Sequence, residues 1–238
     1  MENIKYYFYK TVESTMYTAK SIIPKIHDEH IHCIVAENQT GGIGQRSNKW
    51  ESPRGNLYCT YIFPKKILHG NEKYLPFAFS TAFTNHLRKD HCIDIKLKWP
   101  NDFILNNSKV GGMLCEICDE FIIIGIGLNV RKKIDKLTGY ETTTLNNHEH
   151  KLSIKELIKN VEHYIFQNIK TLNKNWDIIR SNWEKHSYGI GKKFSFKTSD
   201  NHLKEGVFIG ITNDGHIKFL INEKINIFHT LSNIRIIS

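Results

Sequence analysis

The chain has 238 residues, of which 40% are hydrophobic, so a packed core is expected and intrinsic disorder is excluded. Its longest apolar runs, such as residues 121–126, are too short to cross a bilayer, and its first residues lack the apolar core of a signal peptide. We therefore expect a cytoplasmic protein with no membrane contact. The formal net charge of +9 favours acidic partners, although a lysine-rich composition alone would also produce it.

The first three quarters of the chain alternate between strand and helix patterns. Ser14 and Thr15 can cap the first predicted helix. A polar, glycine-rich segment without a hydrophobic period occupies residues 38–55. In chain order we expect a strand at 6–10, a helix at 16–22, strands at 32–37 and 56–63, a helix at 71–88, strands at 93–97, 103–105, 110–118 and 121–130, and helices at 154–169 and 172–179.

The pattern changes after Gly189-Ile190-Gly191. Short strands are expected at 193–196, 205–212, 216–220 and 224–228, with turns at 213–215 and 222–223. This meander predicts a small barrel-like unit. We therefore divide the chain into a domain of residues 1–188 and a domain of residues 189–238.

Two groups of residues resemble metal sites. The odd number of cysteines, without a signal peptide, predicts reduced thiols, and Cys115 and Cys118 form an isolated Cys-x-x-Cys pair. Residues three apart in a strand face opposite sides, so we interpret these two as one core and one surface residue. The three histidines at 27, 30 and 32 surround Asp28 and Glu29, and we interpret them as a solvated loop before a strand.

The run Lys98-Trp99-Pro100-Asn101-Asp102 has no evident folding purpose. Pro100 and Asn101 interrupt an apolar strand, so the run lies at a strand end, where sites are commonly built. Lysine, asparagine and aspartate can bind a phosphate, a sugar or adenine edge, and a cation. The run therefore favours an ATP-using enzyme.

The segment 36–50 carries Gly41, Gly42 and Gly44, and ends at Trp50. Glycines let backbone N–H groups converge on an anion and allow close approach to a ligand. The segment lacks the Gly-Lys-Ser/Thr ending of a Walker loop and opens no helix, so a dinucleotide fold is disfavoured. A mobile surface loop is the alternative. Trp50 could stack on a ligand ring or act as the hinge of a lid, and simple packing in the core is its alternative.

In combination, five stretches resemble the biotin–protein ligase family. They occur in the family's order and are Ser14-Thr15; Glu37 through Trp50 with Ser52-Pro53 and Asn56-Leu57-Tyr58; Lys98 to Asp102; Lys109 to Glu116; and Gly125 to Asn129. The resemblance implies an α+β fold with a class II synthetase-like core, in which helices pack on a mixed or antiparallel sheet. It also implies a small C-terminal SH3-like β-barrel, and a monofunctional type without an N-terminal DNA-binding domain.

The resemblance implies a two-step reaction. Biotin attacks the α-phosphate of ATP to give biotinyl-AMP and pyrophosphate, and a lysine of a biotin carboxyl carrier protein or domain, from acetyl-CoA carboxylase or a related carboxylase, then displaces AMP. The catalytic residue would be Lys109, bridging the biotin carboxylate and the α-phosphate, because the first step joins two anions. Mg²⁺ would neutralise the triphosphate.

The remaining site residues follow from the same resemblance. Biotin would contact Lys109 and five further residues, namely Ser14, Thr15, Gln39, Gly42 and Gly112. ATP and the adenylate would contact Gly44, Arg46, Asn48, Trp50, Lys98, Asn101 and Asn129. Asp102 is the candidate residue near the metal.

The glycine loop departs from the family's pattern. The family usually has Gly-Arg-Gly-Arg-Arg-Gly-Arg, whereas this chain has Gly42-Ile43-Gly44-Gln45-Arg46-Ser47-Asn48, and the usual Ser-Thr-Asn ends in Met16. In the family the arginines hold the reactive adenylate. We hypothesise that this chain retains biotinyl-AMP less tightly, or that Lys49 substitutes.

The resemblance also bears on partners and rivals. Ser14 and Thr15 lie so early that no helix-turn-helix is expected before them, so DNA is not an expected partner, and the basic charge suits acidic carrier domains. Family members are monomers or join through sheet edges, so a homodimer is one of two assemblies allowed. The rival functions are a lipoate or octanoate ligase and a non-enzymatic nucleic-acid-binding protein; the latter predicts clustered Lys/Arg among exposed aromatics, which the chain lacks.

Overall fold

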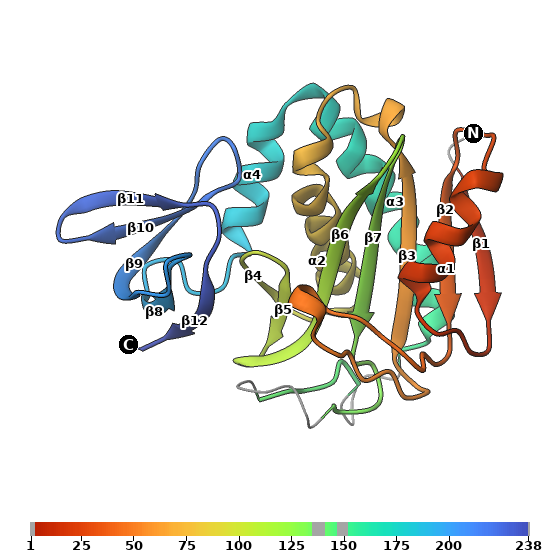
Figure 1. The fold of residues 1–238 in the computed structure, drawn as a ribbon, viewed down its shortest axis with the longest axis horizontal. Coiled ribbons are helices and arrows are strands. Elements are labelled where there is room, and N and C mark those ends of the chain that lie inside the picture. The colour runs from red at the N-terminus through yellow and green to blue at the C-terminus, as the bar shows by residue number, and fades with distance from the viewer. Residues whose placement is uncertain (1–2, 135–140, 147–151, 238) are drawn as a thin grey trace.

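The computed structural model describes residues 3–134, 141–146 and 152–237, which form two sheets with flanking helices (Figure 1). The first part contains β1 (Ile4–Tyr9), α1 (Thr15–Ile22), β2 (Ile31–Ala36), β3 (Leu57–Pro64), α2 (Leu75–His91), β4 (Lys96–Lys98), β5 (Asp102–Leu105), β6 (Ser108–Cys118), β7 (Phe121–Leu128), α3 (Ile154–Lys174) and α4 (Trp176–Lys185). The second contains β8 (Lys193–Lys197), β9 (Leu203–Ile211), β10 (Ile217–Ile221), β11 (Lys224–Phe228) and β12 (Ser232–Ile236).

The larger sheet has seven strands in the order β1-β2-β3-β7-β6-β5-β4. The strands β1 and β2 are parallel, and the other neighbours are antiparallel, so the predicted mixed sheet is confirmed. The helices α2 and α3 pack on one face and α1 on the other, which gives the expected α+β class.

The two sheet faces are built by alternation along the strands. In β7, Ile122, Ile124 and Ile126 join the large core with α2 and α3, whereas Ile123 joins the smaller cluster beneath α1. The α1 face is therefore only partly covered by apolar side chains. The remainder of that face is available for a site.

The predicted strand at 93–97 is wrong in its first half, because β4 begins only at Lys96. Ile93 and Ile95 are buried in the main core, yet they pair with no strand, and the amide of Ile93 bonds to the carbonyl of Leu87 at 3.0 Å after α2 ends. The alternating apolar pattern thus reflects packing under the helices rather than a sheet ladder.

The predicted break between helices at 169–172 is also displaced. Helix α3 begins after its cap Ser153 and runs on to Lys174, and the chain breaks at Asn175, whose side chain accepts a bond from the amide of Asp177 at 2.8 Å to start α4. Across the three ranges that the model describes, no helix is both long and apolar enough to span a membrane.

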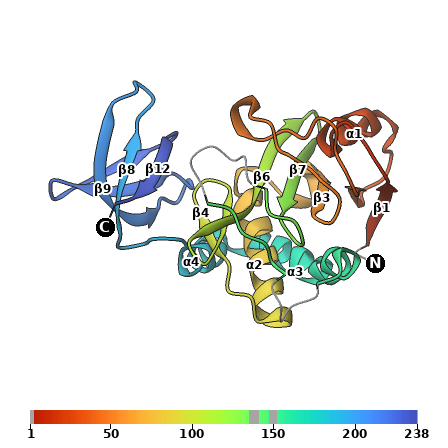
Figure 2. The same ribbon diagram turned by 90° about the horizontal axis from the view of Figure 1, so that it is seen from below.

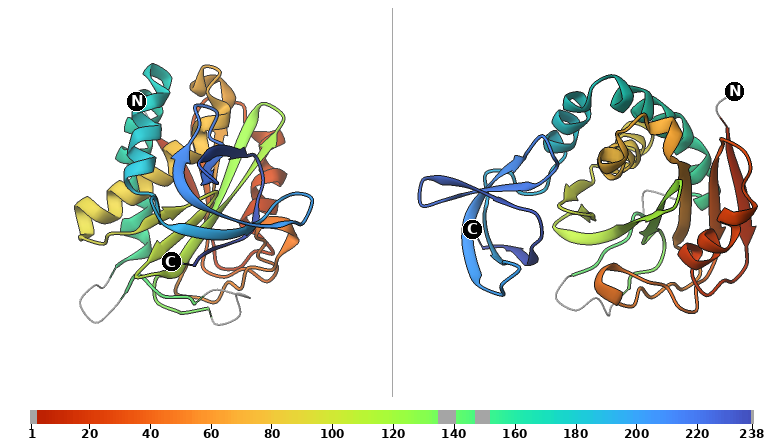
Figure 3. Two further views of the ribbon diagram at one scale, coloured as in Figure 1. Left: turned by 90° about the vertical axis from the view of Figure 1, so that its left-hand side faces the viewer. Right: turned by 45° about the horizontal axis from the view of Figure 1, so that its top comes forward.

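The second sheet is antiparallel with the order β11-β10-β9-β8-β12, and it matches the small C-terminal β unit that the sequence predicts. Four of its strands were expected and β12 was not, because Ser232 to Ile236 contains the polar pair Asn233 and Arg235. Figures 2 and 3 show this sheet beside the β4 and β5 edge of the larger sheet.

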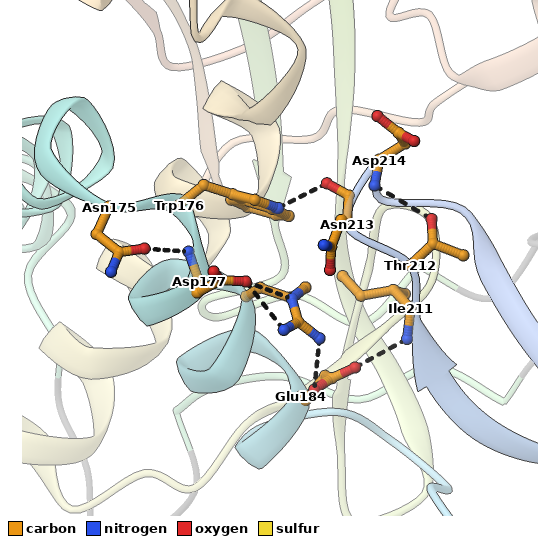
Figure 4. A network of polar contacts seen from close by, with 9 residues as sticks. Asn175, Trp176, Asp177, Glu184, Ile211, Thr212, Asn213 and Asp214 are labelled. Carbon is orange, nitrogen blue, oxygen red and sulfur yellow. Dashed lines mark hydrogen bonds and ion pairs between the residues drawn. The ribbon is translucent and has the colours of Figure 1, made fainter.

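Helix α4 fastens the second sheet to the first part of the chain (Figure 4). The indole Nε1 of Trp176 donates to the carbonyl of Asn213 at 2.7 Å, and the amide of Ile211 donates to Glu184 Oε1 at 2.9 Å. Trp99, between β4 and β5, donates to the carbonyl of Gly215 at 3.2 Å. The β9–β10 turn is therefore held from two sides.

Substitutions at two glycines, Gly210 and Gly191, test the contact between Glu184 and the second sheet. Both have positive φ, +114° at Gly210 and +80° at Gly191, but a Cβ at Gly210 would lie 2.5 Å from Glu184 Oε1, whereas one at Gly191 meets nothing within 4 Å. Gly191→Ala should lower the free energy of unfolding by about 1 kcal/mol through backbone strain alone. Gly210→Ala should lower it by about 3 kcal/mol, because Glu184 must also move. Urea denaturation measures both, and equal losses would contradict this account of the contact.

Candidate active site

A cavity of about 490 Å³ opens on the α1 face of the larger sheet. It is bounded by the glycine loop, the β4–β5 connection, the strands β6 and β7 and a segment of the second sheet. Its lining residues are 14–16, 39, 43–46, 48–50, 98–102, 109, 112–114, 125–127 and 231–234. Most of the residues predicted from the sequence thus meet in one space, and Gly42 and Asn129 do not line it.

One end of the cavity carries uncharged hydrogen-bonding groups. Gln39 Oε1 accepts from the amide of Thr15 at 2.8 Å and from Thr15 Oγ1 at 3.1 Å, while Gln39 Nε2 donates to Ser52 Oγ at 2.8 Å. Thr60 Oγ1 donates to Thr15 Oγ1 at 2.9 Å from beneath. Ser14 is buried and caps α1 through the amide of Met16. These bonds fix the orientation of the Gln39 amide and suit a neutral polar ligand group.

Gly42 lies behind this end rather than on its lining. A Cβ there would lie 2.3 Å from the carbonyl oxygen of Trp50, 2.6 Å from Ser52 Oγ and 3.0 Å from Gln39 Nε2. The glycine is required because the loop backbone passes directly over these groups. Its contribution to the site is therefore to hold Gln39 and Trp50 in place.

The other end of the cavity is cationic. Arg46, Lys49, Lys98 and Lys109 lie among its described lining residues, and Asp102 is the one acidic side chain there. Lys109 Nζ forms an ion pair with Asp102 Oδ1 at 2.6 Å, beside Gly112, and lies 5.5 Å from the centre of the Trp50 ring. Such a concentration of positive charge suits a polyanion.

Lys98 is the buried cation of this group, with 6% of its surface exposed. Burial lowers the pKa of its ammonium group to about 8, and the positive charges of Lys109 and Arg235 act in the same direction, whereas Asp102 opposes them. Its Nζ donates to the carbonyl of Ile234 at 2.7 Å.

The glycine loop is folded back on itself. The amide of Gly44 donates to the carbonyl of Asn48 at 2.7 Å, and Arg46 between them has a left-handed backbone with φ of 54°. The guanidinium of Arg46 donates through Nη2 to the carbonyl of Leu231 at 2.8 Å. The loop is thus held against the second sheet.

Trp50 and the glycines of β7 form a flat wall. Trp50 is buried against Tyr58 and Ile134, as the core-packing alternative expects, and it also lines the cavity. Stacking of its ring on a ligand stays a prediction. A Cβ at Gly127 would lie 2.6 Å from Trp50 Nε1, and one at Gly125 would lie 2.7 Å from the sulfur of Met16. Side chains at these two positions would collide with Trp50 and Met16, and this need for glycine was not apparent from the sequence.

The two asparagines of the predicted site differ in position. Asn101 lines the cavity, its Nδ2 donates to the carbonyl of Met113, and its own carbonyl accepts from the Met113 amide at 2.9 Å. Asn129 is fully buried beside the cavity, and its Nδ2 donates to the carbonyl of Thr143 at 3.2 Å. Asn101 ties the β4–β5 connection to β6, and Asn129 anchors the segment after β7.

The segment Leu231 to Ile234, which we name the strap, was missed by the sequence reasoning. It begins 102 residues after Asn129, where the last family-like stretch ends, in a part of the sequence that has the pattern of an ordinary meander and contains no motif. In the structure its backbone lines the cavity and accepts bonds from Arg46 and Lys98. Only its placement by the second sheet reveals it.

Two groups of residues resemble metal sites in the sequence, one around Cys115 and one around His27. Within the described ranges, no three His, Cys, Asp or Glu side chains are arranged to hold a metal ion. Cys115 is exposed and Cys118 half buried. His27 is exposed as predicted, but the prediction of a solvated loop is wrong for His32, which is buried in β2 and contacts Asp28 and Tyr7 at 3.0 Å each.

Solved structures show the same fold. A biotin protein ligase from Aquifex aeolicus, solved with biotin and ATP, superposes with a TM-score of 0.84 at 25% identity, covering 98% of this chain and 99% of that one. A biotin protein ligase from Leishmania major, solved with biotinyl-5-AMP, superposes with a TM-score of 0.66 at 22% identity, which shows the fold alone.

Sequence comparisons give the family. The Bacillus subtilis protein named bifunctional ligase/repressor BirA is 27% identical over 203 residues, covering 81% of this chain and 62% of that protein. The Mycobacterium tuberculosis biotin–[acetyl-CoA-carboxylase] ligase is 36% identical over 118 residues, covering 48% of this chain and 44% of that protein. The chain thus spans less than two thirds of either relative. The model of the biotin/lipoate A/B protein ligase family matches residues 8–129, which is half of the chain, and the chain therefore belongs to that family.

Proposed function

We propose that the protein attaches biotin to a lysine of a carrier domain, at the expense of ATP, through biotinyl-5′-AMP. The observation that carries this proposal is the division of one cavity into an uncharged end at Thr15 and Gln39 and a cationic end at Lys98 and Lys109. Biotin has a neutral ureido head and an anionic tail, and ATP adds three phosphates. The names of its relatives support the same activity.

The uncharged end fits the ureido group. Gln39 Oε1 is held by Thr15, and Gln39 Nε2 keeps one N–H beyond its bond to Ser52. Burying a ureido group without partners would cost about 1–3 kcal/mol for each unpaired atom, so fixed short polar side chains favour it over an apolar ring. Gly125 and Gly127 line the cavity, and because they lack side chains Met16 and Trp50 pack directly against β7 there.

In the first step the biotin carboxylate oxygen attacks the α-phosphorus of ATP, and the bond to the bridging oxygen of the β-phosphate breaks. Pyrophosphate leaves with the electron pair. Lys109 provides the positive charge between the two anions, and its ion pair with Asp102 aims the ammonium group before substrates arrive. Lys98 and Arg46 line the same cavity and add to the positive charge there.

Magnesium belongs to the substrate as MgATP. Mg²⁺ is ordinarily held by one or two carboxylates together with phosphate oxygens. Asp102 is the one carboxylate among the described lining residues, so it fits as the protein group that contacts the ion, although it is also paired with Lys109. Phosphates would supply the other oxygen ligands.

In the second step the amine of a carrier lysine attacks the carbonyl carbon of biotinyl-AMP. The bond to the AMP oxygen breaks, AMP leaves, and the amine releases its proton. We infer that the carrier is the biotin carboxyl carrier domain of a carboxylase and that the reaction takes place in the cytoplasm. We also infer that residues 1–188 form the catalytic domain and residues 189–238 a small C-terminal domain, which adds residues 231–234 to the cavity lining.

Substrate choice tests the proposal directly. ATP–pyrophosphate exchange should occur with biotin and not with lipoate or octanoate, and Lys109→Gln should lower it at least about 100-fold because the charge between the two anions is lost. Lys159→Gln, an exposed lysine of α3, is the control and should keep full exchange. Exchange with lipoate alone would identify a lipoate ligase. Exchange with none of the three acids would favour the rival function, a non-enzymatic nucleic-acid-binding protein.

The lowered pKa of Lys98 predicts a pH dependence. Above about pH 8 the ammonium group of the free enzyme loses its proton and its attraction for phosphate, so kcat/KM for ATP should fall as the pH rises through that value. Lys98→Met should be at least about tenfold less efficient at pH 7 and should lack this fall. The profile is measured by pyrophosphate exchange, and an identical fall in the variant would exclude Lys98 as its origin.

The arginine-poor loop predicts weak retention of the intermediate. Restoring cations with Ile43→Arg, Gln45→Arg and Asn48→Arg together should slow dissociation of biotinyl-AMP about tenfold, because each can add a charge-assisted bond to phosphate. The control combines Ile43→Gln with Asn48→Gln, which adds polar length without charge. Dilution of the labelled adenylate complex gives the rates, and equal rates would show that Lys49 or other groups already suffice.

A further inference from the structure

The strap joins the second sheet to two of the four basic residues at the cationic end of the cavity. The carbonyl of Leu231 accepts from Arg46 Nη2 at 2.8 Å, and the carbonyl of Ile234 accepts from Lys98 Nζ at 2.7 Å. Arg46 comes from the glycine loop and Lys98 from the end of β4, so the strap is the one described segment that contacts both in this way. The strap thereby helps to fix the positions of the Arg46 guanidinium and the Lys98 ammonium group.

An ordinary strand could not make both contacts. Successive carbonyls along a strand point to opposite sides, so residues three apart, such as 231 and 234, would face away from each other. In β12, however, Ser232 pairs with Lys197 and Arg235 with Ser195, so three steps on β12 match two on β8. The extra residue is a β-bulge, a feature that bends a strand beside a site.

Asn233 creates this bulge. Its φ is +51°, in the left-handed region that asparagine tolerates better than most residues and that β-branched residues avoid. The reversal at this one residue lets the flanking carbonyls converge on the cavity. Asn233 itself also lies on the cavity lining.

Arg46 keeps donors for a ligand while it is held by the strap. A guanidinium has five N–H groups, and the strap bond uses one of them. A neutral carbonyl also stabilises the buried charge of Lys98 without cancelling it, as a second carboxylate would. The strap therefore orients these cations rather than neutralising them.

We propose that Asn233 is a positioning residue for the nucleotide, whose left-handed backbone aims the Leu231 and Ile234 carbonyls so that Arg46 and Lys98 are oriented toward the phosphates of ATP. The proposal rests on the proposed function for the identity of the nucleotide. It assigns the second sheet a part in the first step of the reaction, through backbone groups that no sequence motif marks.

The test compares Asn233→Val with Asn222→Val. Asn222 has a φ of +49° in the β10–β11 turn and lies outside the cavity lining, so the same substitution imposes the same kind of backbone strain in the same sheet. Asn233→Gly accepts positive φ and serves as the conservative variant. ATP affinity is measured by calorimetry with MgATP, KM values for ATP and biotin by pyrophosphate exchange, and folding by thermal unfolding.

We expect Asn233→Val to weaken ATP binding and raise the KM for ATP about tenfold, the effect of losing one or two charge-assisted contacts. The KM for biotin should stay within about twofold, Asn233→Gly should recover most of the ATP affinity, and Asn222→Val should bind ATP like the native chain. If the valine variant fails to fold, Asn233→Ala, with less strain, replaces it in the same comparison.

Two results would overturn the proposal. One is unchanged ATP affinity in folded Asn233→Val or Asn233→Ala; the other is a loss of ATP and biotin affinity together, matched by Asn222→Val, which would indicate only a structural role. Failure of the proposed function is a separate result, because it would appear as absent exchange with biotin in the native chain. Calorimetry with MgATP would still decide the role of Asn233 in that event.

Discussion

The site depends on one strand that serves two faces with different residues. On β7, isoleucines at 122, 124 and 126 fill the core beneath α2 and α3, while Gly125 and Gly127 on the other face let Met16 and Trp50 pack directly against the strand at the cavity wall. Because side chains alternate along a strand, the same segment supplies both the packing of the core and a wall of the cavity. A shift of register by one residue would place isoleucine side chains where Met16 and Trp50 now pack, and would displace these two residues of the cavity lining.

The positively charged side chains of the cavity are also held by groups of two kinds. At the cationic end of the cavity, most of the contacts are made by neutral groups, which leave the positive charge intact. Backbone carbonyls contact Arg46 and Lys98, and the ring of Trp50 lies near Lys109. Asp102 is the exception, and it faces the lysine to which we assign the chemistry. Positive charge is therefore concentrated where a polyanion would reside, at the expense of some stability of the ligand-free fold.

Much of this arrangement could be predicted from the sequence, because it depends on helix caps, turns and strand ends that neighbouring residues determine. Ser14 caps a helix, Asn106 and Asn107 turn a hairpin with φ of 49° and 62°, and the run from Lys98 to Asp102 ends a strand. The strand predicted at 93–97 was wrong in its first half, because Ile93 and Ile95 alternate with polar residues as in a strand but are buried under the helices instead. The strap could not be predicted, since its contribution comes from carbonyl groups that every residue possesses and from a three-dimensional juxtaposition with Arg46 and Lys98.

The bond between Arg46 and Leu231 joins residues 185 positions apart. Contacts of such sequence separation form late, because the entropy of closing the intervening chain must be offset by structure already gained. The cavity wall is complete only when the second sheet has formed and docked, because Leu231 to Ile234 belong to its lining. Partial opening of the contact between the two sheets would therefore remove the Leu231 and Ile234 carbonyls from Arg46 and Lys98, even where the strands of each sheet stay paired.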